Sequence, residues 1–226
     1  MKIGLVYTST TPELIELVEA EVMKNLGEAI EIVAYQDGTI LEETRNAGVV
    51  TGVAAAKLVT FYMKAVLEGA DAILNICSSV GEVADAAQDL AKYIGVPIVR
   101  IDEEMCKDAV RLAAGKGGRI GVLATLPTTL EPTKKTILRV ARELGRNVVI
   151  TDGLINAFGA DREELKRLLV KKALEIKEQV DVILLCQGSM AYCEAALAEV
   201  CQKPVVSSPR YGAAALKEAL RQKGLV

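Results

Sequence analysis

The sequence contains no histidine, which removes the commonest general base and the commonest metal ligand of proteins. Acid–base or nucleophilic chemistry must therefore rest on cysteine, aspartate, glutamate, lysine, tyrosine or the backbone. None of the five cysteines forms a CxxC pair, and their odd number without a secreted context argues against a disulfide framework. We therefore expect free thiols and no metal site.

The sequence also lacks a surplus of basic residues and a long apolar run. Lys and Arg together number 27 against 30 for Asp and Glu, which argues against nucleic acid or an anionic membrane as a partner. The apolar stretch at the start of the chain is too short for a signal peptide or a membrane span. We therefore expect a cytoplasmic protein that binds neither nucleic acid nor membrane.

Apolar runs of strand length alternate with segments of helical period along the 226 residues, a pattern typical of α/β proteins with parallel sheets. The same order occurs twice, because strands expected over 2–7 and over 119–124 both lead into a hydroxyl-rich turn and a helix. An internal duplication explains such an ordered series better than chance. We predict two pseudo-symmetric lobes, each a short parallel sheet flanked by helices, with the active site in the cleft between them. Residues 1–100 with 207–226 form the first expected lobe, to which the C-terminal helix returns, and residues 101–206 form the second.

A cysteine ends one expected strand in each half. The run over 72–76 ends in Cys77, and the run over 182–186 ends with Cys186, which we expect to repeat the role of Cys77. A turn between strand and helix places a thiol beside free backbone N–H groups and the positive end of a helix dipole, where anions bind and thiol pKa values fall. Ligands of parallel α/β folds bind beyond the carboxyl ends of the strands. We therefore expect both thiols to be reactive and, if the lobes face one another, to approach a shared cleft.

Hydroxyl, amide and small residues surround these turns and are candidate ligands for a carboxylate. The same residue types are ordinary helix caps and turn formers, so a structural role is the alternative for each. The candidates for binding substrate are Thr8, Ser9, Ser78, Ser79, Thr125, Thr128, Gln187, Gly188 and Ser189.

Four segments, CSSVGE at 77–82, LLCQGSM at 184–190, IGLVYTST at 3–10 and GVLATLPTT at 121–129, resemble the aspartate/glutamate/hydantoin racemase superfamily. The resemblance covers nearly the whole chain. In that family two cysteines flank the α-carbon of a carboxylate-bearing substrate, and one removes the proton while the other donates one on the opposite face. The resemblance implies that Cys77 and Cys186 have these roles. It also implies a small carboxylate or hydantoin-like substrate, no cofactor, and a homo-oligomer.

The sequence departs from the amino-acid racemases of this family after both cysteines. Those enzymes typically continue with Asn-Thr and with Thr-His or Thr-Glu, whereas Ser78-Ser79 and Gln187-Gly188 stand here, which argues against a glutamate racemase. The Cys-Ser-Ser turn also resembles hydantoin racemases, maleate cis-trans isomerases and arylmalonate decarboxylases. The last keep one catalytic cysteine, on the second-lobe side, so the presence of Cys77 argues against decarboxylation.

Three alternatives stay open at this point. A maleate-type cis-trans isomerase would use one cysteine that adds covalently to a double bond. A non-catalytic anion-binding protein would use the same architecture with buried, inert thiols. Cys193, expected within the following helix, is a rival of Cys186 for the second role, although packing is the better explanation for it.

Overall fold

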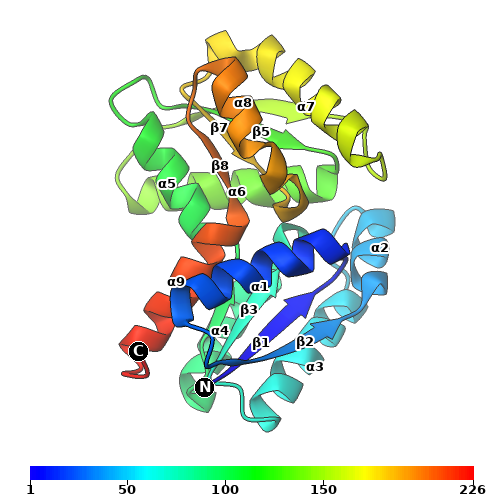
Figure 1. Cartoon of the computed structure of the whole chain (residues 1–226), viewed down its shortest axis with the longest axis vertical. Helices are drawn as coiled ribbons and strands as arrows, with labels where there is room; N and C mark the ends of the chain where they lie inside the picture. Colours follow the sequence, from blue (N-terminus) through cyan, green and yellow to red (C-terminus); the bar gives the residue numbers. More distant parts are fainter. The chain divides into compact units, whose positions relative to one another are not determined.

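The computed structural model describes all 226 residues and divides them into two compact units. Residues 1–101 and 209–226 form unit 1, and residues 102–208 form unit 2. Each unit contains one four-stranded parallel sheet, with the strand order β2-β1-β3-β4 in unit 1 and β6-β5-β7-β8 in unit 2. The prediction of an α/β protein with two parallel sheets is therefore confirmed (Figure 1).

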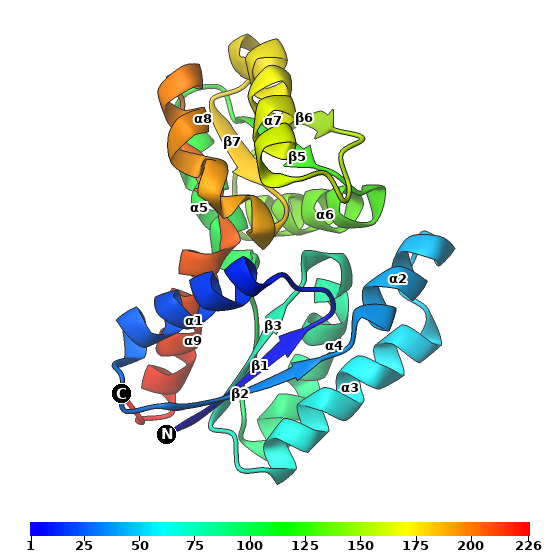
Figure 2. The same cartoon turned by 45° about the vertical axis from the view of Figure 1, so that its right-hand side comes forward.

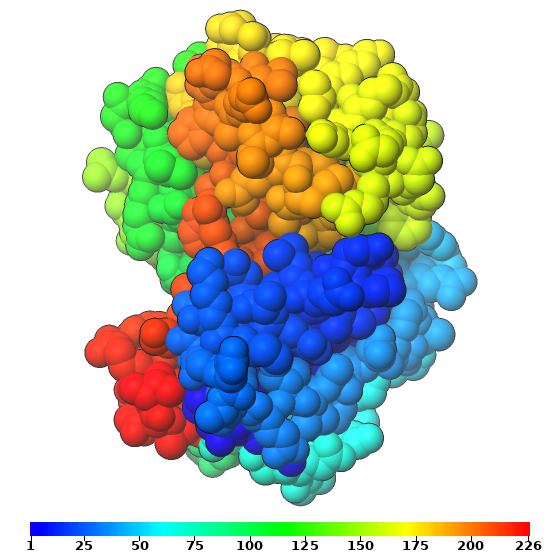
Figure 3. Space-filling view, in the orientation of Figure 1, coloured from blue at the N-terminus to red at the C-terminus, as the bar shows by residue number.

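Unit 1 places helices on both faces of its sheet (Figure 2). Ile3, Leu5 and Tyr7 pack with α1 and α9, whereas Val6 packs with α3 and α4, because successive residues of a strand point to opposite faces. Figure 3 shows α1 in blue and α9 in red at the surface of this unit. The elements are β1 (Lys2–Tyr7), α1 (Pro12–Leu26), β2 (Glu31–Gln36), α2 (Gly38–Ala47), α3 (Gly52–Leu67), β3 (Ala72–Ile76), the 3-10 helix η1 (Ser78–Val80), α4 (Gly81–Ile94), β4 (Ile98–Arg100) and α9 (Ser208–Gln222).

Unit 2 has the same layered construction. Leu123, Ile183 and Leu185 pack against α7, η3 and α8 on one face, and α5 and α6 contact β5 as well. The elements are α5 (Glu103–Ala113), β5 (Arg119–Ala124), α6 (Pro127–Glu143), β6 (Val149–Leu154), α7 (Arg162–Ile176), the 3-10 helix η2 (Lys177–Gln179), β7 (Val182–Leu185), the 3-10 helix η3 (Gly188–Cys193), α8 (Glu194–Cys201) and β8 (Val205–Ser207).

The two units repeat a pair of hydrogen bonds at the start of their sheets. In unit 1 the Lys2 N–H donates to Asp71 Oδ2 at 2.8 Å, and the Asp71 N–H donates to the Lys2 carbonyl at 2.8 Å. In unit 2 the Arg119 N–H donates to Asp181 Oδ2 at 3.0 Å, and the Asp181 N–H donates to the Arg119 carbonyl at 2.8 Å. Lys2 therefore corresponds to Arg119 and Asp71 to Asp181, which fixes a residue-by-residue alignment of the two repeats.

Local structure differs from the sequence-based expectation in two places. The sequence predicts a turn at Asp37 and Gly38 and a polar stretch to Ala47, but this segment forms α2, because the Asp37 carboxylate accepts the Thr39 N–H at 2.9 Å and caps a new helix. The sequence predicts one helix from Met190 to Val200, but the segment begins as η3, and α8 starts only at Glu194. No helix combines the length and apolar character that crossing a membrane requires.

Candidate active site

Cys77 stands directly between β3 and η1, as the strand-to-helix turn predicts. Its side chain is half-buried and packs with the cluster that includes Ile73, Tyr62 and Val83, so it points to the face covered by α3 and α4. Ile76, one residue earlier, packs on the opposite face with α1. Cys77 therefore lies at the carboxyl end of its sheet, where parallel α/β folds bind ligands.

Hydrogen-bond donors gather around the Cys77 sulfur. Burial raises the pKa of the Cys77 thiol, while the Thr8 hydroxyl, the Ser79 and Val80 N–H groups and the Ser79 hydroxyl act in the opposite direction. The expectation that the turn lowers this pKa is therefore wrong in its net direction, because desolvation outweighs the donors. The Thr8 hydroxyl is fully buried and makes no hydrogen bond of ordinary geometry within the protein, so it is free to turn toward the sulfur.

The register of the two sheets places Gln187, and not Cys186, at the position equivalent to Cys77. Ala72 lies level with the second residue of β1, and Val182 lies level with the second residue of β5. Counting five residues forward from each of these gives Cys77 in unit 1 and Gln187 in unit 2. Cys186 lies one residue earlier. The expectation that Cys186 repeats the position of Cys77 is therefore wrong.

Side-chain contacts support the same alignment. Thr8 lies beside the Cys77 sulfur, and at the matching place in unit 2 Gln187 Oε1 accepts the Thr125 N–H at 2.8 Å and the Thr125 hydroxyl at 2.9 Å. Cys77 and Gln187 also both stand at the N-cap of the 3-10 helix that follows, with extended backbone. The repeat thus pairs a thiol in unit 1 with a carboxamide in unit 2.

Cys186 faces α6 rather than the turn that follows it. Its side chain is fully buried, and its hydrogen-bond partner is the Thr133 hydroxyl of α6. Burial, together with the charges of Asp102 and Asp152, raises the pKa of Cys186 to about 12, and Thr133 acts in the opposite direction. The Thr133 hydroxyl also donates to the Thr129 carbonyl at 2.8 Å.

The remaining candidates divide between the two units. In unit 1 Ser78 is buried and Ser9 is exposed. In unit 2 Gly188 is half-buried, and the Thr128 hydroxyl is buried and has no hydrogen-bond partner. Thr128 belongs to the first turn of α6, whose N-cap residue provides no side-chain cap. Since Gln187 uses its amide oxygen on Thr125, its NH₂ group is left to donate elsewhere.

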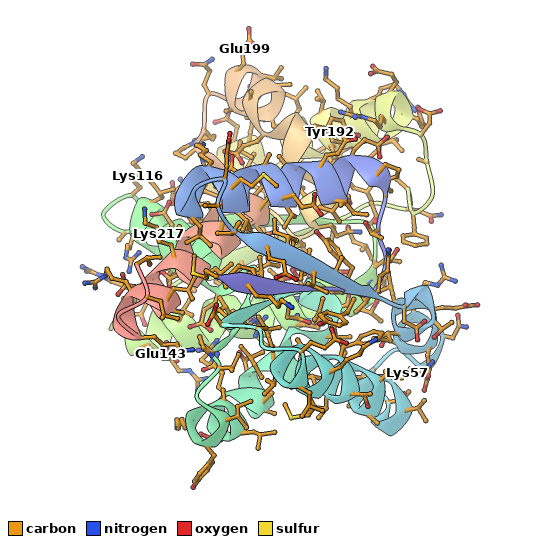
Figure 4. The ribbon with its side chains drawn as sticks, turned by 60° about the horizontal axis from the view of Figure 1, so that its bottom comes forward. Lys57, Lys116, Glu143, Tyr192, Glu199 and Lys217 are labelled. Atoms are coloured by element: carbon orange, nitrogen blue, oxygen red, sulfur yellow. The ribbon has the colours of Figure 1, made fainter.

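Cys193 lies in the hydrophobic core of unit 2. It is fully buried at the end of η3, among residues of α7 and α8. Its neighbour Tyr192, labelled in Figure 4, donates its hydroxyl to the Arg162 carbonyl at 2.8 Å. Packing therefore explains Cys193. No group of three or more His, Cys, Asp or Glu side chains is placed to hold a metal ion.

Sequence analysis missed a series of hydrogen bonds between buried polar side chains beneath the Cys77 turn. The Tyr62 hydroxyl of α3 donates to Asn75 Oδ1 at 2.9 Å, and Asn75 Nδ2 donates to the Cys77 carbonyl at 3.1 Å. Both side chains are fully buried. The signal that could have identified this series is Asn75 itself, the one polar residue within the apolar run of β3.

The sequence matches the model of the family described as Asp/Glu/Hydantoin racemase over residues 3–216. The chain belongs to this family. Its members are racemases, so the protein is an enzyme of the isomerase type.

Solved structures of racemases share the fold of this family member. Allantoin racemase from Klebsiella pneumoniae is 18% identical with a TM-score of 0.67, and the match covers 100% of this chain and 89% of that one. Glutamate racemase RacE1 from Bacillus anthracis is 17% identical with a TM-score of 0.72, covering 99% and 82%. An arylmalonate decarboxylase is 14% identical with a TM-score of 0.57, covering 96% and 92%. At these identities the likeness concerns the fold, which therefore hosts more than one reaction.

Proposed function

We propose that this protein is a racemase or epimerase that acts on a small carboxylate-bearing or hydantoin-like substrate without a cofactor, with Cys77 as the group that moves the α-proton. The observation that carries the proposal is the set of donors around the Cys77 sulfur at the carboxyl end of β3. A family of racemases supplies the reaction class. A half-buried thiol with such donors is suited to acid–base work.

The chemistry needs one thiolate and one acceptor for negative charge. The thiolate of Cys77 takes the proton from the α-carbon, and the electron pair of the C–H bond spreads onto the adjacent carbonyl or carboxylate group. If the Cys77 thiol exchanges its proton with solvent before returning it, the α-carbon gains a solvent hydrogen and keeps its configuration. If water donates a proton on the opposite face, the centre is inverted, and the hydroxide formed takes the proton of the Cys77 thiol and restores the thiolate. Atoms and charge balance without a cofactor in this scheme.

Neutral donors of unit 2 are suited to the carboxylate. The Gln187 NH₂ group, the unpartnered Thr128 hydroxyl and the N-terminal N–H groups of α6 all offer hydrogen to an anion. The Thr125 hydroxyl donates to the Gln187 amide oxygen, so the Gln187 NH₂ group points away from Thr125. On unit 1 the hydroxyls and backbone of Thr8, Ser9, Ser78 and Ser79 are the candidate partners, and Gly188 completes the set on unit 2.

The proposal gives Cys186 no direct role, in contrast to the two-cysteine hypothesis drawn from the sequence. That hypothesis requires a second sulfur at the α-carbon. The Cys186 side chain is fully buried against α6, and this burial keeps the thiol protonated. A Cys186→Ala variant therefore discriminates between the one-thiol and two-thiol schemes.

A cis-trans isomerase is the second candidate, and the one-thiol arrangement favours it. The Cys77 thiolate would add to an olefinic carbon of an unsaturated dicarboxylate, forming a C–S bond while the π electrons move to the carbon beside the carboxylate. Rotation about the resulting single bond and loss of the thiolate would then restore the double bond with the other geometry. This reaction needs no second proton-transfer group.

Solvent deuterium exchange, followed by proton NMR, tests the proposal. Purified protein in D₂O is given D- and L-amino acids, their hydantoins and N-carbamoyl derivatives, maleate and substituted malonates. We expect exchange at one α-carbon with loss of optical rotation, abolished in Cys77→Ala and retained in Cys186→Ala. Loss of exchange in both variants would restore the two-cysteine scheme. Isomerised maleate together with a Cys77 adduct in mass spectrometry would establish the second candidate, and full turnover by Cys77→Ala would refute both.

The oligomeric state belongs to the same proposal. The family resemblance implies a homo-oligomer, and we propose that the active form contains at least two chains. Light scattering coupled to size-exclusion chromatography measures the mass directly, and a single 24.1 kDa species that retains activity would contradict this.

A further inference from the structure

Asn75 is a polar residue at an apolar position. It lies in β3 between Leu74 and Ile76, has no exposed surface, and shares the face of Ile73 that packs against α3 and α4. A buried carboxamide is unfavourable unless all its hydrogen-bonding groups find partners. A leucine at this place would pack without that cost, so the amide calls for an explanation beyond stability.

The partners of Asn75 connect helix α3 to the backbone of the thiol. The Tyr62 hydroxyl donates to Asn75 Oδ1 at 2.9 Å and so fixes the orientation of the amide. The opposite end of the amide, Nδ2, donates to the Cys77 carbonyl at 3.1 Å. This carbonyl belongs to the peptide unit that leads into η1, and the orientation of that peptide unit sets the direction of the Ser79 and Val80 N–H groups.

The second repeat shows which residue stands there when the residue two positions later is not a cysteine. By the register of the sheets, Asn75 is equivalent to Leu185, and the residue two positions later is Cys77 in unit 1 and Gln187 in unit 2. Leu185 is fully buried in the hydrophobic core of unit 2. The same place in the same fold therefore accepts a leucine. The amide occurs in the repeat that carries the thiol.

We infer that Asn75, oriented by Tyr62, is a positioning residue that holds the Cys77 carbonyl so that the backbone N–H groups of η1 converge on the Cys77 sulfur. The inference rests on the proposed function of Cys77. Neither side chain touches the reacting atoms, and each acts through the backbone of the turn. Without the Asn75 amide, the peptide unit after Cys77 loses the Asn75 donor and the N–H groups lose their alignment.

The expected consequence is a less stable thiolate. Hydrogen bonds to a charged group favour the charged form, so partial loss of alignment of two N–H donors raises the Cys77 thiol pKa by about one unit. The charged groups nearest this chain are Arg100 of β4 and Asp85 of α4, which are ion-paired at 2.5 Å. They are present in every variant below, so they do not account for a difference between variants.

The test measures the pH dependence of iodoacetamide alkylation at Cys77, followed by mass spectrometry of its peptide, in Asn75→Leu and Tyr62→Phe. Asn75→Leu installs the residue that the other repeat carries, and Tyr62→Phe removes only the hydroxyl that orients the amide. Tyr35→Phe is the matched control, because it also removes a phenol hydroxyl in the same unit, but one whose partner is the Glu68 carboxylate. At fixed pH below the pKa, one unit corresponds to a tenfold slower reaction.

We expect alkylation of Cys77 about tenfold slower in Asn75→Leu, a smaller decrease in Tyr62→Phe, and no change in Tyr35→Phe. The Tyr62→Phe and Asn75→Leu effects should not add in the double variant, because both act through the same amide. Equal rates in folded Tyr62→Phe and wild type, or an equal decrease in the Tyr35→Phe control, would overturn the inference. The assay needs no substrate, so a pKa shift without deuterium exchange would refute the proposed function and leave this inference standing.

Discussion

The buried Cys186 thiol should lower the free energy of unfolding at alkaline pH. Comparison of wild type with a Cys186→Ala variant measures this decrease. An unfolded cysteine ionises near pH 8.5, whereas burial against α6 keeps folded Cys186 protonated up to a pKa of about 12. Between these values the unfolded state releases a proton that the folded state retains. The free energy of unfolding therefore falls as pH rises, and below pH 8.5 the contribution is fully present.

The magnitude follows from the linkage slope. Each pH unit between the two pKa values costs about 1.4 kcal/mol per thiol, so Cys186 alone removes about 2 kcal/mol of stability between pH 7.5 and pH 10. Replacing the buried sulfur by hydrogen in Cys186→Ala costs roughly 1 kcal/mol at neutral pH. Wild type should therefore be about 1 kcal/mol more stable than Cys186→Ala at pH 7.5 and about 1 kcal/mol less stable at pH 10.

Urea unfolding at both pH values, with a phosphine reductant present, measures this difference. Far-ultraviolet circular dichroism is the suitable signal, because the chain has no tryptophan and tyrosine emission changes with its own ionisation. The control is Ile183→Val, a buried substitution in β7 that involves no titratable group. Its difference from wild type in the free energy of unfolding should be the same at every pH. A wild-type advantage over Cys186→Ala that does not change with pH would show that the Cys186 thiol is not shielded as the structure implies.

Two further predictions concern reactivity and the repeated hydrogen bonds. Cys77 should be the first thiol alkylated by iodoacetamide in the folded protein, because the other four have at most 3% of their surface exposed; peptide mass spectrometry over time would contradict this if another cysteine reacted first. Asp181→Ala should cost about 2–4 kcal/mol and Asp71→Ala about 1–2 kcal/mol in urea unfolding, because Asp181 accepts from the Arg119 backbone and guanidinium whereas Asp71 accepts the Lys2 N–H. Arg119 lowers the pKa of Asp181, so this contribution should be present above about pH 4 and be lost as pH falls further. Equal losses in the two variants would contradict the argument.

Periodicity predicted the fold because the strands of a sheet covered on both faces form nearly continuous apolar runs. The run over 72–76 matches β3, and the run expected over 182–186 contains β7 and extends one residue beyond it. The helix α2 was not predicted, because its polar sequence has the composition of a turn and only the Asp37 cap indicates a helix start. Local composition thus predicts buried elements better than exposed ones.

The candidate site could be predicted only in part. Cys77 and its hydroxyl neighbours follow from the sequence motif. Cys186 was matched to Cys77 because both are cysteines. The alignment fixed by Asp71 and Asp181 instead places Cys186 one residue before the position equivalent to Cys77. A shift of one residue turns a side chain to the other face of a sheet. The chain from Tyr62 through Asn75 was not predictable either, because the rotation of α3 against β3 is a property of packing.

The two repeats carry different chemical groups at matching positions. Both repeats keep the aspartate hydrogen bonds at the start of the sheet and a threonine, Thr8 or Thr125, at the same position. The equivalent residues at the end of the third strand instead differ in chemical type. Unit 1 has an amide and then a thiol, and unit 2 has a leucine and then a carboxamide. A thiol surrounded by donors can change its charge, but a carboxamide held by Thr125 can only donate. At the same place the two halves of the family fold therefore carry a titratable group in one repeat and a neutral donor in the other, and Cys186, although a cysteine at a strand end, lies at neither place.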